Sequence, residues 1–142
     1  MAIADVLEEL QEEFDLLGDW QERYQYVIDL GNELPPFPTS DQTEVNKVQG
    51  CLSQVWLVTK RNPDGTISFR GYSDGHISRG LVAILLRLYS GETPENILSF
   101  DAKAAFARLD LPSALTVQRS NGLHSMNERI RREAASMAAS AA

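Results

Sequence analysis

The residues best suited to chemistry in this 142-residue chain are one cysteine, Cys51, and two histidines, His76 and His124. A zinc site needs about four ligands, and these side chains are too few and have no ligand spacing. An iron–sulfur cluster normally takes four thiolates, and a thiol–disulfide exchanger needs a second, resolving cysteine. We therefore expect no metal site and no cofactor of the chain's own.

Three uses of Cys51 remain. A cysteine hydrolase would pair the thiol with His76, and the preceding Asp74 could hold that histidine. A pure interaction module would keep the cysteine as a small buried hydrophobe, which is the commoner fate of a free cysteine. A carrier would present the thiol on a loop, accept sulfur from the persulfide of another protein and hold it, since no second thiol could discharge it. We favour the carrier, which needs the thiolate and access to it.

The first half of the chain predicts two helices and then strands. Apolar side chains recur at three- and four-residue spacing in two segments, and Asp19 followed by Glu22 forms a capping box for the second helix. A strand buried on both faces before the turn Asn62–Gly65 and alternating apolar residues after it predict an antiparallel hairpin. Cys51 lies where a proline-containing loop enters this hairpin, and Gly50 before it permits unusual backbone shapes. The predicted elements cover residues 3–17, 20–34, 45–48 (a short strand), 54–60 and 67–73.

The second half predicts helices. A stripe from Ile77 to Leu88 follows Asp74, a candidate N-cap, and Thr93 caps a helix that begins at Pro94. Further helices follow Asp101 and begin at about residue 121, and residues 138–142 form a fraying tail. This order predicts a single α+β domain over residues 1–142, with two N-terminal helices, a small antiparallel sheet and several helices packed on the sheet.

The charge is uneven. The formal net charge is −7, with −10 in residues 1–50 and +3 in residues 51–142. This balance disfavours nucleic-acid binding, and the acidic half is either a solvated helix face or a docking surface for a basic partner. No apolar run approaches the ~20 residues of a membrane span. The N-terminus has no features of a signal or transit peptide, so we expect a reducing compartment, either the bacterial cytoplasm or an organelle after removal of a leader.

The run from Val48 to Trp56 resembles the SufE family of cysteine desulfuration proteins. The family pattern is Val-x-Gly-Cys-x-Ser-x-Val-Trp, and the likeness extends along nearly the whole chain. At position 52 many members carry Gln where this chain has Leu52, and His76 is not a family feature. The matching residues of the run are Val48, Gly50, Cys51, Ser53, Val55 and Trp56.

The resemblance implies a function and a set of site residues. Such proteins take sulfane sulfur from a PLP-dependent cysteine desulfurase of the SufS/CsdA type, stimulate it, and pass the sulfur to an iron–sulfur scaffold. The resemblance implies an accessory protein and not an enzyme, because the PLP belongs to the partner. It also implies a three-stranded NifU-like antiparallel sheet, and we expect a monomer or weak homodimer. Cys51 would be the acceptor, Gly50 and Ser53 would shape its loop, and Asp74 and Arg119 would lie nearby, with Arg119 favouring the thiolate.

Overall fold

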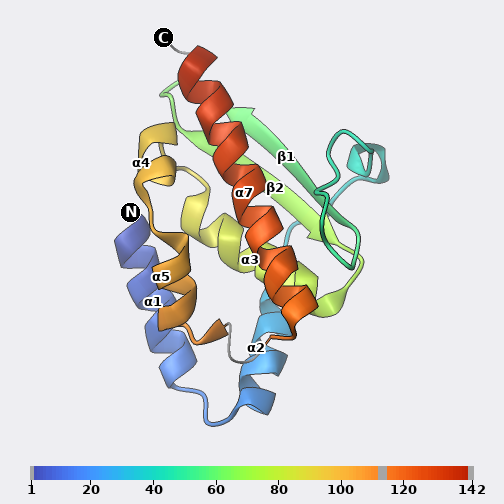
Figure 1. The fold of residues 1–142 in the computed structure, drawn as a ribbon, viewed down its shortest axis with the longest axis vertical. Coiled ribbons are helices and arrows are strands. Elements are labelled where there is room, and N and C mark those ends of the chain that lie inside the picture. Colours follow the sequence, from blue (N-terminus) through green and yellow to red (C-terminus); the bar gives the residue numbers. More distant parts are fainter. Residues whose placement is uncertain (1, 112–114, 141–142) are drawn as a thin grey trace.

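The computed structural model describes residues 2–111 and 115–140 and shows helices arranged around a small antiparallel sheet (Figure 1). The elements in chain order are α1 (Ile3–Asp15), α2 (Trp20–Asn32), a short 3-10 helix (Thr39–Asp41), β1 (Val55–Arg61), β2 (Ile67–Ser73), α3 (His76–Tyr89), α4 (Pro94–Ser99), α5 (Ala102–Arg108) and α7 (Val117–Ser140). Side chains from both ends of the chain share one hydrophobic core. The predicted α+β class is confirmed.

The two N-terminal helices follow the predicted apolar stripes. The Asp19 carboxylate caps α2 by accepting a hydrogen bond from the backbone N–H of Glu22 at 3.0 Å. α2 packs closely on α3 because Gly80 has no side chain; a Cβ there would lie 2.1 Å from the carbonyl oxygen of Val27. This crossing fixes the position of α3, whose N-terminal end lies beside the cysteine loop. The buried residues of α1 are Ile3, Leu7, Leu10 and Phe14.

The hairpin is the predicted one, but the sheet has fewer strands than expected. β1 and β2 pair antiparallel from Val55↔Ser73 to Arg61↔Ile67. In place of a third strand the described chain has two isolated bridges, one between Ile67 and Glu92 and one between Lys47 and Trp56. The expected three-stranded sheet is therefore reduced to two strands and two bridges, and on the β1 side the pairing ends near Lys47. The pairing stops there because the chain turns away from β1 at Gly50, whose φ is +87°.

The two faces of the hairpin are covered differently. On one face, side chains of β1, α3 and α7 meet around a narrow apolar gap. On the other face, the ring of Tyr72 stacks between Trp56 and Phe37, with centroid distances of 6.4 and 6.1 Å. The loop before β1 therefore lies over the sheet through Phe37. The residues that line the gap are Val48, Val55, Leu57, Val82, Leu85, Leu86, Met126 and Ile130.

Two predicted boundaries in the second half were wrong. α7 begins at Val117, before the predicted residue 121, and runs through Ala138 and Ala139 to Ser140. The fraying of the tail stays a prediction, and residues 141–142 lie outside the described chain. The N-cap residue of α3 is Gly75, and it makes no side-chain cap. The prediction that Asp74 caps this helix was therefore wrong. The caps Thr93 and Asp101 of α4 and α5 are present.

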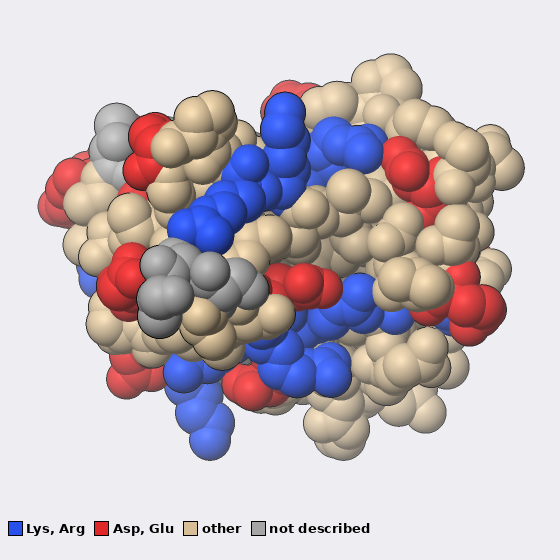
Figure 2. All heavy atoms as spheres, turned by 90° about the horizontal axis from the view of Figure 1, so that it is seen from above, with Lys and Arg blue, Asp and Glu red and all other residues tan. Residues whose placement is uncertain are grey.

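Charged side chains of both signs are interspersed on the face seen from above, although the chain is acidic overall (Figure 2). None of the helices in the described ranges is long and apolar enough to cross a membrane.

Candidate functional site

Cys51 lies in the loop that connects the Lys47 bridge to β1, and its side chain points onto α7. The Sγ atom is 3.7 Å from the carbonyl oxygen of Gly122 on that helix, close enough for the thiol to donate a weak hydrogen bond. The side chain is half-buried and packs against the edge of the core. The thiol is therefore partly covered by the protein's own helix.

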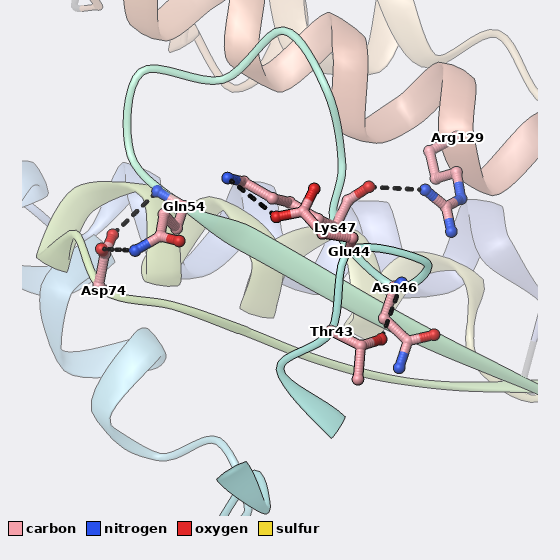
Figure 3. A network of polar contacts seen from close by, with 7 residues as sticks. All are labelled: Thr43, Glu44, Asn46, Lys47, Gln54, Asp74 and Arg129. Atoms are coloured by element: carbon pink, nitrogen blue, oxygen red, sulfur yellow. Dashed lines mark hydrogen bonds and ion pairs between the residues drawn. The ribbon is translucent and has the colours of Figure 1, made fainter. Parts of the chain in front are cut away.

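The end of the loop that enters β1 is fixed by Asp74. Its carboxylate accepts hydrogen bonds from the backbone N–H of Gln54 at 2.9 Å and from the Gln54 side-chain amide at 3.1 Å (Figure 3). The Ser73 hydroxyl donates to the Gln54 carbonyl oxygen at 2.7 Å. Asp74 thus lies near the cysteine loop, as the family resemblance implied, and holds its backbone three residues from the thiol.

The other end of the loop is fixed by Arg129 of α7. Its guanidinium donates to the carbonyl oxygen of Lys47 at 3.0 Å, which Figure 3 shows, and to that of Val45 at 2.8 Å. The backbone N–H of Val48 also donates to the Val55 carbonyl oxygen at 2.8 Å, which closes the base of the loop. Between these two anchors lies the tip, residues 49–53, which is held to α7 by the weak hydrogen bond from Cys51 to Gly122.

Two further predicted residues lie at the tip. Gly50 has a φ of +87°, and a Cβ on it would lie 2.6 Å from the Ser125 hydroxyl of α7. The Ser53 side chain lies against Gly75, where a Cβ would come within 2.3 Å of the Ser53 hydroxyl. The absence of a side chain at Gly50 and at Gly75 therefore lets the tip lie close to α7 and to the start of α3.

Burial raises the pKa of the Cys51 thiol above its ordinary value. Burial disfavours the charged thiolate, and no charge in the described chain offsets it. Arg119 lies in the first turn of α7, three residues before Gly122, and is half-buried. Burial is the cause of the raised pKa of the thiol, and the expected effect of Arg119 on the thiolate stays a prediction. The resting site keeps the thiol protonated and a poor nucleophile.

Neither histidine forms a hydrogen bond with Cys51 in the described part of the chain. His76 is the exposed first residue of α3, and within the described ranges no hydrogen bond joins it to Cys51. His124 packs edge-on against Phe106 and lines an open cavity of about 550 Å³ between α4, α5 and α7. Cys51 does not line this cavity. No three Cys, His, Asp or Glu side chains of the described residues group as a metal site.

The sequence patterns did not indicate Gln54 and Arg129, which hold the two ends of the loop, or Ser125, which lies against Gly50. Arg129 lies off the apolar stripe of its helix and 82 residues from Lys47 along the chain. No local pattern marks such a long-range contact with a backbone carbonyl. Gln54 was read only as the start of a strand.

The comparisons with known proteins identify the family of this chain. Residues 8–134 match the family described as SufE, Fe-S metabolism associated domain. An uncharacterized SufE-like protein of Rhizobium etli is 49% identical over 131 residues, with 90% of this chain and 88% of that protein covered. One of Rhizobium meliloti (strain 1021) is 47% identical over 131 residues, covering 90% of this chain and 94% of that protein.

A solved structure supports the fold. The solution structure of a hypothetical protein from Thermus thermophilus is similar with a TM-score of 0.76 and covers 94% of this chain and 96% of its own. Its sequence identity of 18% makes this a likeness of fold alone. The family match over most of the chain and the two rhizobial relatives decide the matter: this chain belongs to the SufE family, whose domain is associated with Fe–S metabolism.

Proposed function

We propose that this chain is a sulfur acceptor and carrier that takes sulfane sulfur on Cys51 from a PLP-dependent cysteine desulfurase. In the transfer, the Cys51 thiol gives up its proton and the thiolate attacks the outer sulfur of the donor's cysteine persulfide. The donor's S–S bond breaks, its cysteine leaves as a thiolate, and a new S–S bond forms on Cys51. The step is a sulfur exchange and needs no external oxidant or reductant.

The observation that carries the proposal is the position of Cys51 at the tip of a loop held at both ends. Asp74 and Arg129 hold the two ends through Gln54, Val45 and Lys47. The base of the loop therefore stays in place while a short tip turns outward from α7. This arrangement suits a thiol that is shielded between transfers and presented when a partner binds.

The protonated resting thiol fits a carrier that must not react before it meets its partner. The donor has to draw Cys51 away from Gly122 and relieve the burial that raises the pKa of the thiol. We propose that Arg119, one turn before Gly122, acts in this bound state as a partner contact. The PLP is the partner's cofactor, and the sulfur then passes to an iron–sulfur scaffold in the bacterial cytoplasm.

The proposal is tested with the alanine that a desulfurase releases when cysteine gives up its sulfur. A cognate desulfurase is assayed with this chain and with two variants, Cys51→Ser and His76→Ala. Wild type and His76→Ala should both raise alanine release, because the carrier does not use the histidine, whereas Cys51→Ser should not. Stimulation that depends on His76 would favour the hydrolase pairing, and stimulation without the thiol would leave an interaction module whose cysteine is structural.

A further inference from the structure

Cys51 and the next residue, Leu52, present their side chains in opposite ways. Cys51 is half-buried against α7, whereas the Leu52 side chain is 74% exposed. Large hydrophobic side chains with this much exposure are few in the described chain. Covering a leucine this exposed with the apolar surface of another protein lowers the free energy, because apolar area is removed from water.

The geometry of sulfur transfer decides which surface that is. Consecutive Cα atoms are about 3.8 Å apart, so a protein that brings a sulfur into bonding distance of the Cys51 Sγ also brings its own surface to Leu52. A second surface that covered Leu52 at the same time would have to leave Cys51 open. The sulfur donor is therefore the partner that must accommodate this leucine.

The anchored base of the loop restricts how the tip can turn. Gln54 is bound on one side and Lys47 on the other, so an outward turn of Cys51 has to occur within residues 49–53. Such a turn also moves Leu52, because the two residues share one peptide unit. Turning the thiol outward breaks its contact with α7. Burial of Leu52 in the donor offsets the free energy lost with that contact.

We propose that Leu52 is a specificity-determining anchor that inserts into an apolar recess beside the persulfide of the donor desulfurase and so favours the outward loop. This inference rests on the proposed function. Covering the exposed three-quarters of a leucine gives about a tenfold gain in affinity, ~1.4 kcal/mol. A donor whose recess is polar would discriminate against this chain by a similar factor.

The test compares Leu52→Gln with a matched control, Leu16→Gln. Leu16 is 86% exposed at the end of α1, outside the loop, so its replacement alters exposed apolar surface without touching the site. Neither substitution removes buried packing, and thermal melts verify that both variants fold. The readouts are the apparent KM of a cognate desulfurase for each protein, the rate at saturation, and the alkylation rate of Cys51 in the free protein.

Leu52→Gln should raise the apparent KM about tenfold, leave the free-protein alkylation rate unchanged, and leave the rate at saturation within about twofold. Leu16→Gln should match wild type in all three. An unchanged KM for Leu52→Gln, or an equal rise for Leu16→Gln, overturns the anchor. A loss of self-association in Leu52→Gln with unaltered sulfur transfer also overturns it, in favour of a second copy as the occupant. If wild type accepts no sulfur at all, the proposed function fails instead, and the two failures are distinct.

Discussion

Replacing Gly50 with alanine should release the cysteine loop from α7. Gly50 has a φ of +87°, and a Cβ there would lie 2.6 Å from the hydroxyl of Ser125. Placing an L-residue in this conformation costs about 1–2 kcal/mol before any clash is counted. Undocking the tip removes both costs. The strain alone corresponds to a shift of about 5- to 30-fold toward the outward state, so the Gly50→Ala substitution, which adds the clash, shifts the loop by at least this factor.

The assay is the rate at which a small alkylating reagent modifies Cys51. If the reagent reaches the undocked thiol, the Gly50→Ala rate should rise by at least this factor of about 5- to 30-fold. The Gly50→Ala/Ser125→Ala double variant, which removes the clash but keeps the backbone strain, should fall between the Gly50→Ala variant and wild type. Gly50→Ala should lower the free energy of unfolding by no more than the free energy of undocking the loop, because undocking relieves the strain at position 50.

A second glycine provides the control. Gly65, in the hairpin turn, has a φ of +88° and would have no neighbour within 4 Å of a Cβ. Gly65→Ala therefore introduces the same backbone strain away from the thiol, and it should lower the free energy of unfolding by about 1–2 kcal/mol without speeding alkylation. Equal acceleration in Gly65→Ala, or no acceleration in Gly50→Ala, would refute the argument that Gly50 keeps the loop docked.

The pH dependence of alkylation gives a further check on the same loop. Burial raises the pKa of Cys51 in the docked loop, so the wild-type rate should reach half its maximum above the ordinary thiol value of about 8.5. Because the folded-state pKa is the higher one, the contribution of this thiol to stability is complete below the ordinary value. It is lost as the pH rises through the raised value. The midpoint should fall toward the ordinary value in Gly50→Ala.

Three other substitutions test separate parts of the account. Asp74→Ala removes both carboxylate contacts to Gln54 and should speed Cys51 alkylation severalfold. The isosteric Asp74→Asn still accepts one hydrogen bond and should speed alkylation less. Equal effects of the two variants would contradict the role of Asp74 in holding the loop by hydrogen bonds. Tyr89→Phe leaves the buried Asn127 carbonyl without its donor and should cost about 1–3 kcal/mol in urea unfolding, and a smaller loss would mean that water replaces the hydroxyl. Arg119→Gln should slow sulfur transfer but leave the alkylation midpoint of the free protein unchanged; a raised midpoint would restore the electrostatic role that the structure does not show.

The parts of the fold that depend on neighbouring residues could be predicted from the sequence. Asp19 and Thr93 each accept a hydrogen bond from an N–H three residues later, so their side-chain type and position were enough. The hairpin was predictable for the same reason, since its turn residues lie between the two strands they join. Asp74 shows the limit: it had the local features of a cap, but the backbone of Gln54, 20 residues earlier, holds its carboxylate.

The candidate site was predictable in the cysteine loop itself and at Asp74, but the contacts that shield the thiol were not. Cys51 was found because the chain has one cysteine and because the residues around it match a family pattern. The contacts that shield it come from α7, whose Gly122 carbonyl lies 71 residues away along the chain. The raised pKa of the thiol follows from that long-range packing, and a sequence pattern carries no measure of burial. The prediction that Arg119 favours the thiolate stays a prediction, which the Arg119→Gln titration tests.

The most direct test of the carrier proposal is the intact mass of the protein after incubation with a cognate desulfurase and cysteine. Wild type should gain one sulfur, about 32 Da, and a thiol reductant should remove it, while Cys51→Ser should gain nothing. No gain on wild type beside an active desulfurase, or the same gain on Cys51→Ser, would contradict the proposal that Cys51 carries sulfur.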